Sequence, residues 1–343
     1  MRRPTISDVA RAAGVSKGAV SYALNGRPGV SEATRRRILA AAEDLGFHAD
    51  RAAVALAGAP AKVVGLTLHR PARTLGVEPF FMELISGLEA ELSLRSYALL
   101  LHMVAGREQE TAVYRRWRHE HAVDGVLVCD VVEHDPRLPV LRELGFPAVV
   151  IGPPPAGEPV SSVWSDDAVS LQEAVEYLAA LGHRRIGHVA GIPDLAHTVI
   201  RAEAFAGLAR RLGLEAAPCA YTDYTGPDGA RATRRLLGAA GRPTALVYDN
   251  DIMAVAGLAV AEELGLSVPR DLSVVAWDDS PVCRIVHPAL TALSRDIATY
   301  GRQAARLLLA SLDGREAVGV AVEPAHLTPR ASTAAPADAR PPA

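Results

Sequence analysis

The chain has 343 residues, of which 49% are hydrophobic and 22% charged, and its formal net charge at pH 7 is −3. This length predicts one large domain or two to three smaller ones, and the net charge by itself indicates no polyanionic partner. The charge is unevenly distributed, however. Residues 1–60 hold nine Lys/Arg against five Asp/Glu (+4), and the rest of the chain holds 27 against 34 (−7). A small basic segment joined to an acidic body suggests that the basic segment contacts phosphate.

Cysteine usage and hydropathy predict a protein of a reducing compartment. Cys129, Cys219 and Cys283 lie far apart without a Cys-x-x-Cys pair, so a disulfide is possible, but we expect reduced thiols. The sequence contains no uninterrupted run of roughly 18 apolar residues, so we predict no membrane-spanning helix. Two arginines near the N-terminus are followed by no apolar run, so we expect no signal peptide and a cytoplasmic location.

Residues 1–46 predict three short helices. Thr5 should cap the first, with Asp8 three residues later as in a capping box, and Ser16 and Ser31 should cap the second and third. Gly14 and Gly46 should end the first and third. Two helices joined by a glycine-containing turn and braced by a third form a helix-turn-helix pattern. The residues expected to face the core are Ile6, Val9, Ala10, Ala13, Val20, Ala23, Leu24, Ile38, either Ala41 or Ala42, and Leu45.

The second predicted helix, within GVSKGAVSYALNG at residues 14–26, has an unusual outer face. Gly18 lies where helix propensity favours almost any other residue. The outward stripe combines a cation, a hydroxyl, a phenol and an amide with this gap, at Lys17, Gly18, Ser21, Tyr22 and Asn25. Such a stripe is suited to contact a polar partner surface. The connector that follows, residues 47–61, could form only about one and a half helical turns, too few to be stable alone.

From Lys62 onward, strands alternate with helices. Apolar runs of strand length recur in two series, the first ending near Gly152, and helical segments separate them. This alternation predicts a fold with a small all-α head and an α/β core of two lobes, each a doubly wound parallel sheet. Residues 334–343 are rich in Pro and Ala, and we expect a disordered tail. The runs are VVGLTL, YALLLHMV, VDGVLV and PAVVIG, then RIGHVAG, APCAYT, TALVYD and LSVVAWD.

Four stretches resemble the LacI/GalR family of bacterial transcription regulators, and the resemblance covers nearly the whole chain except its C-terminal tail. They are TISDVARAAGVSKGAVSYALNG, DDAVSLQEAVEYLAALGHRRIGHVAG, RPTALVYDNDIMAVAGLAVAEELGLSVPRDLSVVAWDDSP and HPALTALSRDIATYGRQAARLLL. The resemblance implies a helix-turn-helix DNA-binding domain at residues 1–46, a hinge helix or linker at 47–61 and an effector-binding core at 62–333. The core lobes would comprise about 62–160 with 291–322, and 161–290 with 323–333, as in periplasmic sugar-binding proteins.

The resemblance also implies which residues contact DNA. The stripe of the second helix would face the major groove, where Lys17 can donate to guanine or phosphate. Ala19 stands where the family frequently has threonine, and Tyr22 where it frequently has arginine, so the usual operator sequence cannot be carried over at the base that the arginine would read. Arg36 would contact phosphate, or would simply be solvated. Leu56 would wedge into a minor-groove base step, although Asp50 puts a charge near phosphate; a flexible linker is the alternative. The residues assigned to DNA are Thr5, Ser16, Lys17, Gly18, Ser21, Tyr22, Asn25, Arg36, Ala53 and Leu56.

Carried onto this sequence, the family's effector site includes the motif EPFF at residues 78–81, where the family has Asn-Pro-Phe-Phe. Carboxylates, an amide, an arginine fork and aromatic faces suit a polyhydroxylated ligand. The aspartates could instead make turns or caps, and either phenylalanine could belong to the core. The implied effector residues are Glu78, Phe80, Phe81, Arg201, Tyr224, Asp249, Asn250 and Asp278. His183 and His188 are expected to be structural, and His119 and His121 diverge on a helix, so no metal site is predicted.

These features predict a homodimeric DNA-binding regulator that binds a near-palindromic operator, needs no cofactor and is controlled by a small molecule, for which a sugar or sugar derivative is favoured. A repressor is favoured; an activator, or a response to a nucleoside, is the alternative. An enzyme is disfavoured because GxSxG, P-loop, GxGxxG and HExxH motifs are missing from the sequence. A transport solute-binding protein would need an export signal.

Overall fold

The computed structural model describes residues 4–24, 28–47, 60–69, 78–155, 157, 159–316 and 318–337. It forms two compact units, one comprising Met1–Val63 with Trp117–Asp124, and the other Val64–Arg116 with Gly125–Ala343. We refer to residues 4–47 of the first unit as the head and to the second unit as the core. Three residues predicted to contact DNA, Asn25, Ala53 and Leu56, lie outside the described residues, as does most of the predicted connector.

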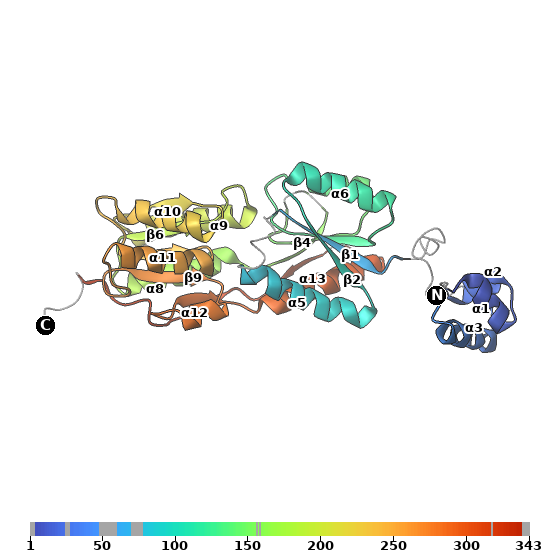
Figure 1. Ribbon diagram of the computed structural model, residues 1–343. Helices are drawn as coiled ribbons and strands as arrows, with labels where there is room; N and C mark the ends of the chain where they lie inside the picture. The colour runs from blue at the N-terminus through green and yellow to red at the C-terminus, as the bar shows by residue number, and fades with distance from the viewer. Residues whose placement is uncertain are drawn as a thin grey trace. The chain divides into compact units, whose positions relative to one another are not determined.

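The head consists of α1 (Ile6–Ala13), α2 (Lys17–Leu24) and α3 (Glu32–Asp44), which confirms the three predicted helices (Figure 1). Local side chains determine where each helix begins. The backbone N–H and the hydroxyl of Thr5 both donate to the Asp8 carboxylate, at 2.9 and 2.6 Å. The Ser16 hydroxyl accepts from Ala19 N–H at 3.2 Å, and the Ser31 hydroxyl accepts from Thr34 N–H at 3.3 Å. These bonds satisfy N–H groups that a helix leaves unpaired at its start.

The head core is built from small and branched side chains on the inner faces of the three helices. Leu45 was predicted to belong to it, but that prediction is wrong: its side chain is 37% exposed. Gly46 adopts a left-handed φ of 60°, so the chain reverses there and Phe47 packs on the core instead. The buried head residues are Val9, Ala10, Ala13, Val20, Ala23, Ile38 and Ala42.

The first lobe of the core contains a six-stranded sheet of order β11-β5-β4-β3-β1-β2. The pairs β1–β3, β3–β4, β4–β5 and β5–β11 are parallel. Helices α5 and α13 cover one face, and α6 lies on the other (Figure 1). The elements are β1 (Val63–Leu68), α5 (Pro79–Leu92), β2 (Ala98–Met103), α6 (Arg107–His119), β3 (Gly125–Val128), α7 (Arg137–Glu143), β4 (Ala148–Ile151), β5 (Ser161–Trp164), α13 (Ile297–Leu312) and β11 (Gly319–Ala321).

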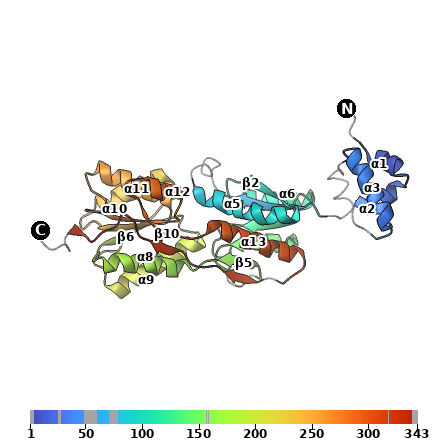
Figure 2. The same ribbon diagram turned by 90° about the horizontal axis from the view of Figure 1, so that it is seen from below.

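The second lobe repeats this topology with the order β12-β10-β9-β8-β6-β7. Only its last pair, β10–β12, is antiparallel among the pairs described. The sheet lies between α8 and α9 on one side and α10 and α11 on the other (Figure 2). The elements are α8 (Asp167–Ala180), β6 (Ile186–Ala190), α9 (Ala196–Leu212), β7 (Cys219–Tyr221), α10 (Gly226–Leu237), β8 (Ala245–Tyr248), α11 (Asp251–Glu263), β9 (Ser273–Trp277), α12 (Pro281–Ile285), β10 (Thr291–Ser294) and β12 (His326–Thr328).

The lobe boundaries differ from those expected at residues 161 and 291. Ser161–Trp164 pairs with β4 and belongs to the first sheet, whereas Thr291–Ser294 pairs with β9 and belongs to the second. The chain therefore crosses between the lobes just after β5 and just after β10, and a third time between β11 and β12. Strand pairing is a long-range property, so the lobe that receives a short strand cannot be inferred from the strand itself.

Residues 334–337, which were predicted to belong to a disordered tail, are described by the structure and contact the second lobe. The Ala334 N–H donates to the Ser273 hydroxyl at 3.1 Å, and its carbonyl lies 2.9 Å from Nε2 of buried His183. Pro336 is also buried, and residues 338–343 lie outside the described chain. His183 thus contacts Ala334 as well as the Ser273 hydroxyl of the second sheet. No helix among the described residues is long and apolar enough to cross a membrane, and they contain no cluster of His, Cys, Asp or Glu suited to a metal.

Candidate functional site

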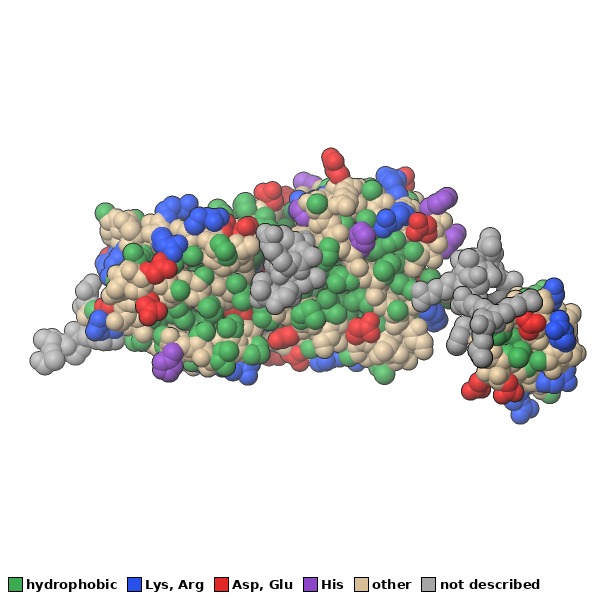
Figure 3. All heavy atoms as spheres, viewed as in Figure 1, with side chains coloured by type: hydrophobic (Ala, Val, Ile, Leu, Met, Phe, Trp, Pro, Cys, Tyr) green, Lys and Arg blue, Asp and Glu red, His purple; other side chains and the backbone are tan. Residues whose placement is uncertain are grey.

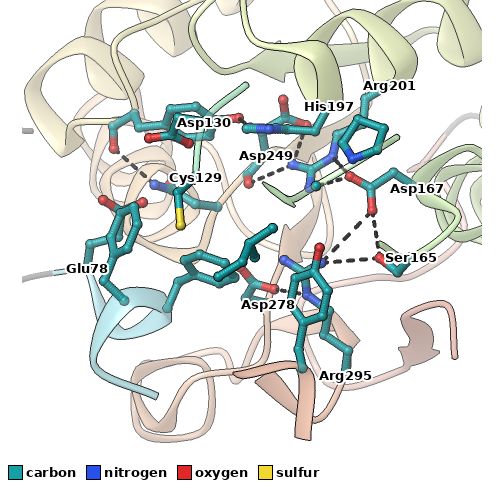
Figure 4. Close-up of a pocket in the computed structure, with 18 residues that line it drawn as sticks. Glu78, Cys129, Asp130, Ser165, Asp167, His197, Arg201, Asp249, Asp278 and Arg295 are labelled. Atoms are coloured by element: carbon teal, nitrogen blue, oxygen red, sulfur yellow. Dashed lines mark hydrogen bonds and ion pairs between the residues drawn. The ribbon is translucent and has the colours of Figure 1, made fainter. Parts of the chain in front are cut away.

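A pocket opens where the carboxyl ends of strands from both sheets face each other (Figure 4). In doubly wound sheets this edge is where ligands bind, because the loops that leave it converge. The empty space between the lining side chains is about 690 Å³, the open mouth included. Charged side chains from both lobes dominate its polar lining, and most of them form ion pairs with one another or with buried neighbours.

Arg201, on α9, is the centre of one group of pocket contacts. Its Nε and Nη2 lie 2.8 Å from the same oxygen of Asp167, and its Nη1 donates to the Asp249 carbonyl at 3.3 Å. The guanidinium also stacks on the Trp277 ring, 3.6 Å from its centroid. Burial opposes the charge, but Asp167 and Asp249 outweigh it and raise the pKa of Arg201. The arginine is therefore held in one orientation by three neighbours.

Asp249 joins this group to a buried histidine. One carboxylate oxygen lies 2.8 Å from Nε2 of His188, and the other accepts the Gly191 N–H at 2.9 Å. Burial would raise the pKa of Asp249, but His188 and Arg201 lower it to about 2. Burial likewise lowers the pKa of His188, but the negative charge of Asp249 outweighs burial and raises this pKa to about 9. The two side chains form an ion pair that rigidifies the pocket floor.

This ion pair predicts a defined pH dependence of stability. The pKa of His188 rises from about 6.5 in the unfolded chain to about 9 in the folded one. The stabilising contribution of the protonated His188 to the free energy of unfolding is therefore complete below about pH 6.5 and disappears as the pH approaches 9. The free energy of unfolding should fall by about 3 kcal/mol across this window. His188→Gln should flatten the profile, measured by urea unfolding from pH 6 to 9. Exposed His326 is the matched control: His326→Gln should leave the slope unchanged, and an equal slope in both variants would refute the assignment.

A second group surrounds Arg295, at the crossing between the lobes. Its Nε donates to Asp278 Oδ1 at 2.9 Å, and its Nη1 lies 3.4 Å from the Ser165 hydroxyl. The guanidinium faces the rings of Phe80 and Tyr300, with centroids at 5.3 and 5.8 Å. Burial opposes its charge, but Asp278 and Asp167 raise the pKa of Arg295. One guanidinium thus bridges side chains of both lobes.

The outer face of α2 is accessible, as the predicted DNA-reading stripe requires. Lys17, Gly18 and Tyr22 are exposed, the last by 45%, and Ser21 is half-buried. Arg36 on α3 is exposed, whereas the neighbouring Arg35 donates to the Ala23 carbonyl at 3.0 Å and so caps the end of α2. Lys and Arg side chains, with some Asp and Glu, are visible on the side of the head that Figure 3 shows.

Comparison with known proteins explains this combination of a head and a two-lobed core. Residues 5–50 match the family described as "Bacterial regulatory proteins, lacI family", and residues 175–333 match the periplasmic binding protein-like domain. The transcriptional regulator CelR of Thermobifida fusca is 34% identical over 342 residues, covering 96% of this chain and 98% of CelR. The chain belongs to the lacI family of bacterial transcription regulators.

Solved structures of lacI-family regulators share this architecture. The structure of a CelR–cellobiose complex has a TM-score of 0.74 and 32% identity, covering 96% of this chain and all of that one. The lac repressor dimer bound to operator and an anti-inducer has a TM-score of 0.83 at 24% identity, covering 97% of this chain and 100% of that chain, and supports the fold. This lacI-family chain is therefore a helix-turn-helix DNA-binding transcription regulator with an effector-binding core.

The pocket of this regulator brings together all eight residues predicted for the effector site. Arg201 and Asp278 form the ion pairs described above, and three further members also use their polar groups within the protein. The Asp249 carboxylate is bonded to His188 and Gly191, and the Asn250 amide caps α11 and donates to the Tyr224 carbonyl at 3.0 Å. The Tyr224 hydroxyl lies 2.8 Å from Nε2 of His197. The predicted residues lining the pocket are Glu78, Phe80, Phe81, Arg201, Tyr224, Asp249, Asn250 and Asp278.

Sequence analysis missed about half of the polar lining. Arg295 lies within LSRDIATY, a stretch noted only for its resemblance, and Asp167 begins α8. His197 lies one turn before Arg201 on α9; burial and the nearby arginine lower its pKa to about 4, so it is neutral at pH 7. Ser165 follows β5 and Arg295 follows β10, two short strands that were not among the predicted runs, so their position at a strand end could not serve as a signal. The missed polar residues are Asp130, Ser165, Asp167, His197 and Arg295.

Proposed function

We propose that this regulator is a repressor whose affinity for its operator is controlled by a sugar of the cellobiose class bound in the pocket. The observation that carries the proposal is the pocket itself: Arg201 and Asp278 of the second lobe and Arg295 at the crossing between the lobes present oriented polar groups, opposite Glu78 and Phe80 of the first lobe. Hydrogen-bonding side chains with fixed geometry suit the many hydroxyls of a sugar. CelR, solved with cellobiose, supports this ligand class. The protein acts by binding alone, in the cytoplasm with its DNA.

The pairing of both pocket arginines with carboxylates favours a polyhydroxylated ligand over an anionic one. Arg201 is neutralised by Asp167, and Arg295 by Asp278, at 2.8 and 2.9 Å. Each guanidinium lies against an aromatic ring, Arg201 against Trp277 and Arg295 against Phe80. Phe80 and Tyr300 add apolar surface that can pack on the C–H face of a sugar ring. Because each arginine already has a carboxylate partner, the ligand does not need to carry a negative charge.

On the DNA side, we propose that α2 lies in the major groove of a near-palindromic operator. Lys17 and Tyr22 would contact base edges, and Arg36 a phosphate. A homodimer would present two heads to half-sites about one helical turn apart. The effector then acts through its different affinities for two core states, a coupling of about 1–3 kcal/mol that is reciprocal between sugar and DNA.

The test is the affinity of the full-length dimer for its operator, titrated with and without cellobiose. Cellobiose should lower operator affinity at least fivefold and should raise the melting temperature, because a ligand stabilises the state that it binds. Adenosine and cytidine, run at the same concentrations, represent the nucleoside alternative. A change in operator affinity with a nucleoside but not with cellobiose would replace the sugar proposal by that alternative.

A further inference from the structure

The two lobes touch at a second place besides the crossing segments. The Ala196 N–H of the second lobe donates to the Val131 carbonyl of the first at 2.8 Å. Beside this bond, Val132 and Leu195 form an isolated antiparallel bridge. Ala196 is the first residue of α9, where the helix itself offers no partner for the backbone N–H. The first lobe thus supplies the acceptor that the start of α9 needs.

The acceptor lies on a constrained loop, residues 129–135. Asp130 and His134 have φ values of 52°, a left-handed conformation that costs energy for residues with a side chain. Arg137 holds the loop in this form. Its guanidinium donates to the Asp130 carbonyl at 3.0 Å and to both oxygens of Asp135 at 2.9 and 2.6 Å. The Val132 N–H donates to the same carboxylate at 3.2 Å.

Arg137 is itself anchored in the interior of the first lobe. Its side chain is 2% exposed, and Nη1 donates to Glu110 on α6 at 2.9 Å. Burial opposes its charge, but Asp135 and Glu110 raise the pKa of Arg137, so it is charged at any physiological pH. The Tyr114 hydroxyl also donates to Glu110 at 2.8 Å. The loop is therefore fixed from behind by a buried network rather than by the pocket.

Both partners of the interlobe contact carry pocket residues. Cys129 and Asp130, on the loop, line the pocket from the first lobe. His197 and Arg201, one and five residues after Ala196 on α9, line it from the second. A shift of the loop relative to the start of α9 would therefore change the distance between the two walls of the pocket.

We propose that the Val131–Ala196 contact is a latch that holds the lobes at the spacing required by the effector, and that Arg137 is a positioning residue for this latch. Opening the latch lowers the population of the binding-competent arrangement, and effector affinity falls by the same factor. The role proposed for the latch in effector binding rests on the proposed function, which assigns the pocket to the effector. The first test of the latch, however, requires no ligand.

Ala196→Pro removes the latch with little disturbance of the helix. Proline is favoured at the first helical position, and Leu195 already has the extended conformation that a residue before proline needs, with φ −74° and ψ 131°. The substitution deletes the N–H donated to Val131 and directs a ring carbon at that carbonyl. Ala196→Ser, which keeps the N–H, is the matched control.

Hydrogen exchange of the full-length protein without sugar provides the first readout. In Ala196→Pro, amides of residues 129–135 should exchange at least fivefold faster, while those from Phe205 to Leu212 at the end of α9 stay at the wild-type rate. The second readout is cellobiose affinity, which should fall about tenfold in Ala196→Pro and less than twofold in Ala196→Ser. Wild-type loop exchange in Ala196→Pro would overturn the latch, and unchanged cellobiose affinity despite faster exchange would overturn its role in the pocket.

Arg137→Lys tests the positioning role separately. Lysine keeps the charge but cannot bond to the Asp130 carbonyl and both Asp135 oxygens at once. It should reproduce faster loop exchange and weaker cellobiose binding in the folded protein. A lower melting temperature with wild-type loop exchange would show that Arg137 is merely structural. If wild-type protein failed to bind cellobiose, the sugar proposal would fail, and the exchange comparison would still decide on the latch.

Discussion

Arg201→Lys and Asp278→Ala should each weaken cellobiose binding about 100-fold or more and abolish the effect of the sugar on operator affinity. Arg201 makes contacts in fixed directions with Asp167, Asp249 and the Trp277 ring, and lysine provides only a point charge. Asp278 orients Arg295 through a 2.9 Å bond. Loss of one partner of a buried, hydrogen-bonded charge pair costs about 2–5 kcal/mol in binding.

The measurement is isothermal titration of each purified variant with cellobiose, followed by operator titrations with and without the sugar. Both variants should bind operator without sugar as the wild type does, since the substituted residues lie in the core pocket and not on the head. Glu262→Ala, an exposed site on α11, is the matched control and should retain the full response. Loss of operator binding in both pocket variants would mark these residues as structural, and a full sugar response in either would remove that residue from the effector site.

Tyr22→Ala and Arg36→Ala should weaken DNA binding in two different ways. Tyr22 is 45% exposed on the outer face of α2, where the phenol can reach a base edge, so its loss should relax the preference for operator over random DNA by about tenfold, or 1–3 kcal/mol. Arg36 is exposed on α3. A phosphate contact there carries no sequence information, so Arg36→Ala should weaken all sites alike and reduce the salt slope by about one unit.

These effects separate in binding titrations against operator and random DNA at several salt concentrations. Tyr22→Phe keeps the ring and removes only the hydroxyl, so comparing it with Tyr22→Ala distinguishes a hydrogen bond to a base from an apolar contact. Equal losses on operator and random DNA in Tyr22→Ala would exclude the base-reading role. An unchanged salt dependence of DNA binding in Arg36→Ala would indicate that Arg36 makes no phosphate contact and is simply solvated in the complex.

Local features of this protein could be predicted from the sequence because the interactions that create them are short-range. Thr5 and Asp8 are three residues apart and bond directly, and Ser16 and Ser31 cap the helices that follow them. The eight apolar runs that were predicted as strands each contain a strand of the structure, since a parallel sheet covered on both faces requires continuous apolar segments. The resemblance supplied the positions of the pocket loops, which leave the carboxyl ends of those strands.

Tertiary structure alone decided which residues meet. Ser161–Trp164 and Thr291–Ser294 were assigned to the wrong lobes because their strand partners lie far away in the sequence. Arg295 reaches Ser165 across 130 residues, and His188 reaches Asp249 across 61. Neither contact leaves a periodic signal in the chain. The Val131–Ala196 latch is a backbone contact that no side-chain pattern encodes, so it emerged only when the two lobes were placed together.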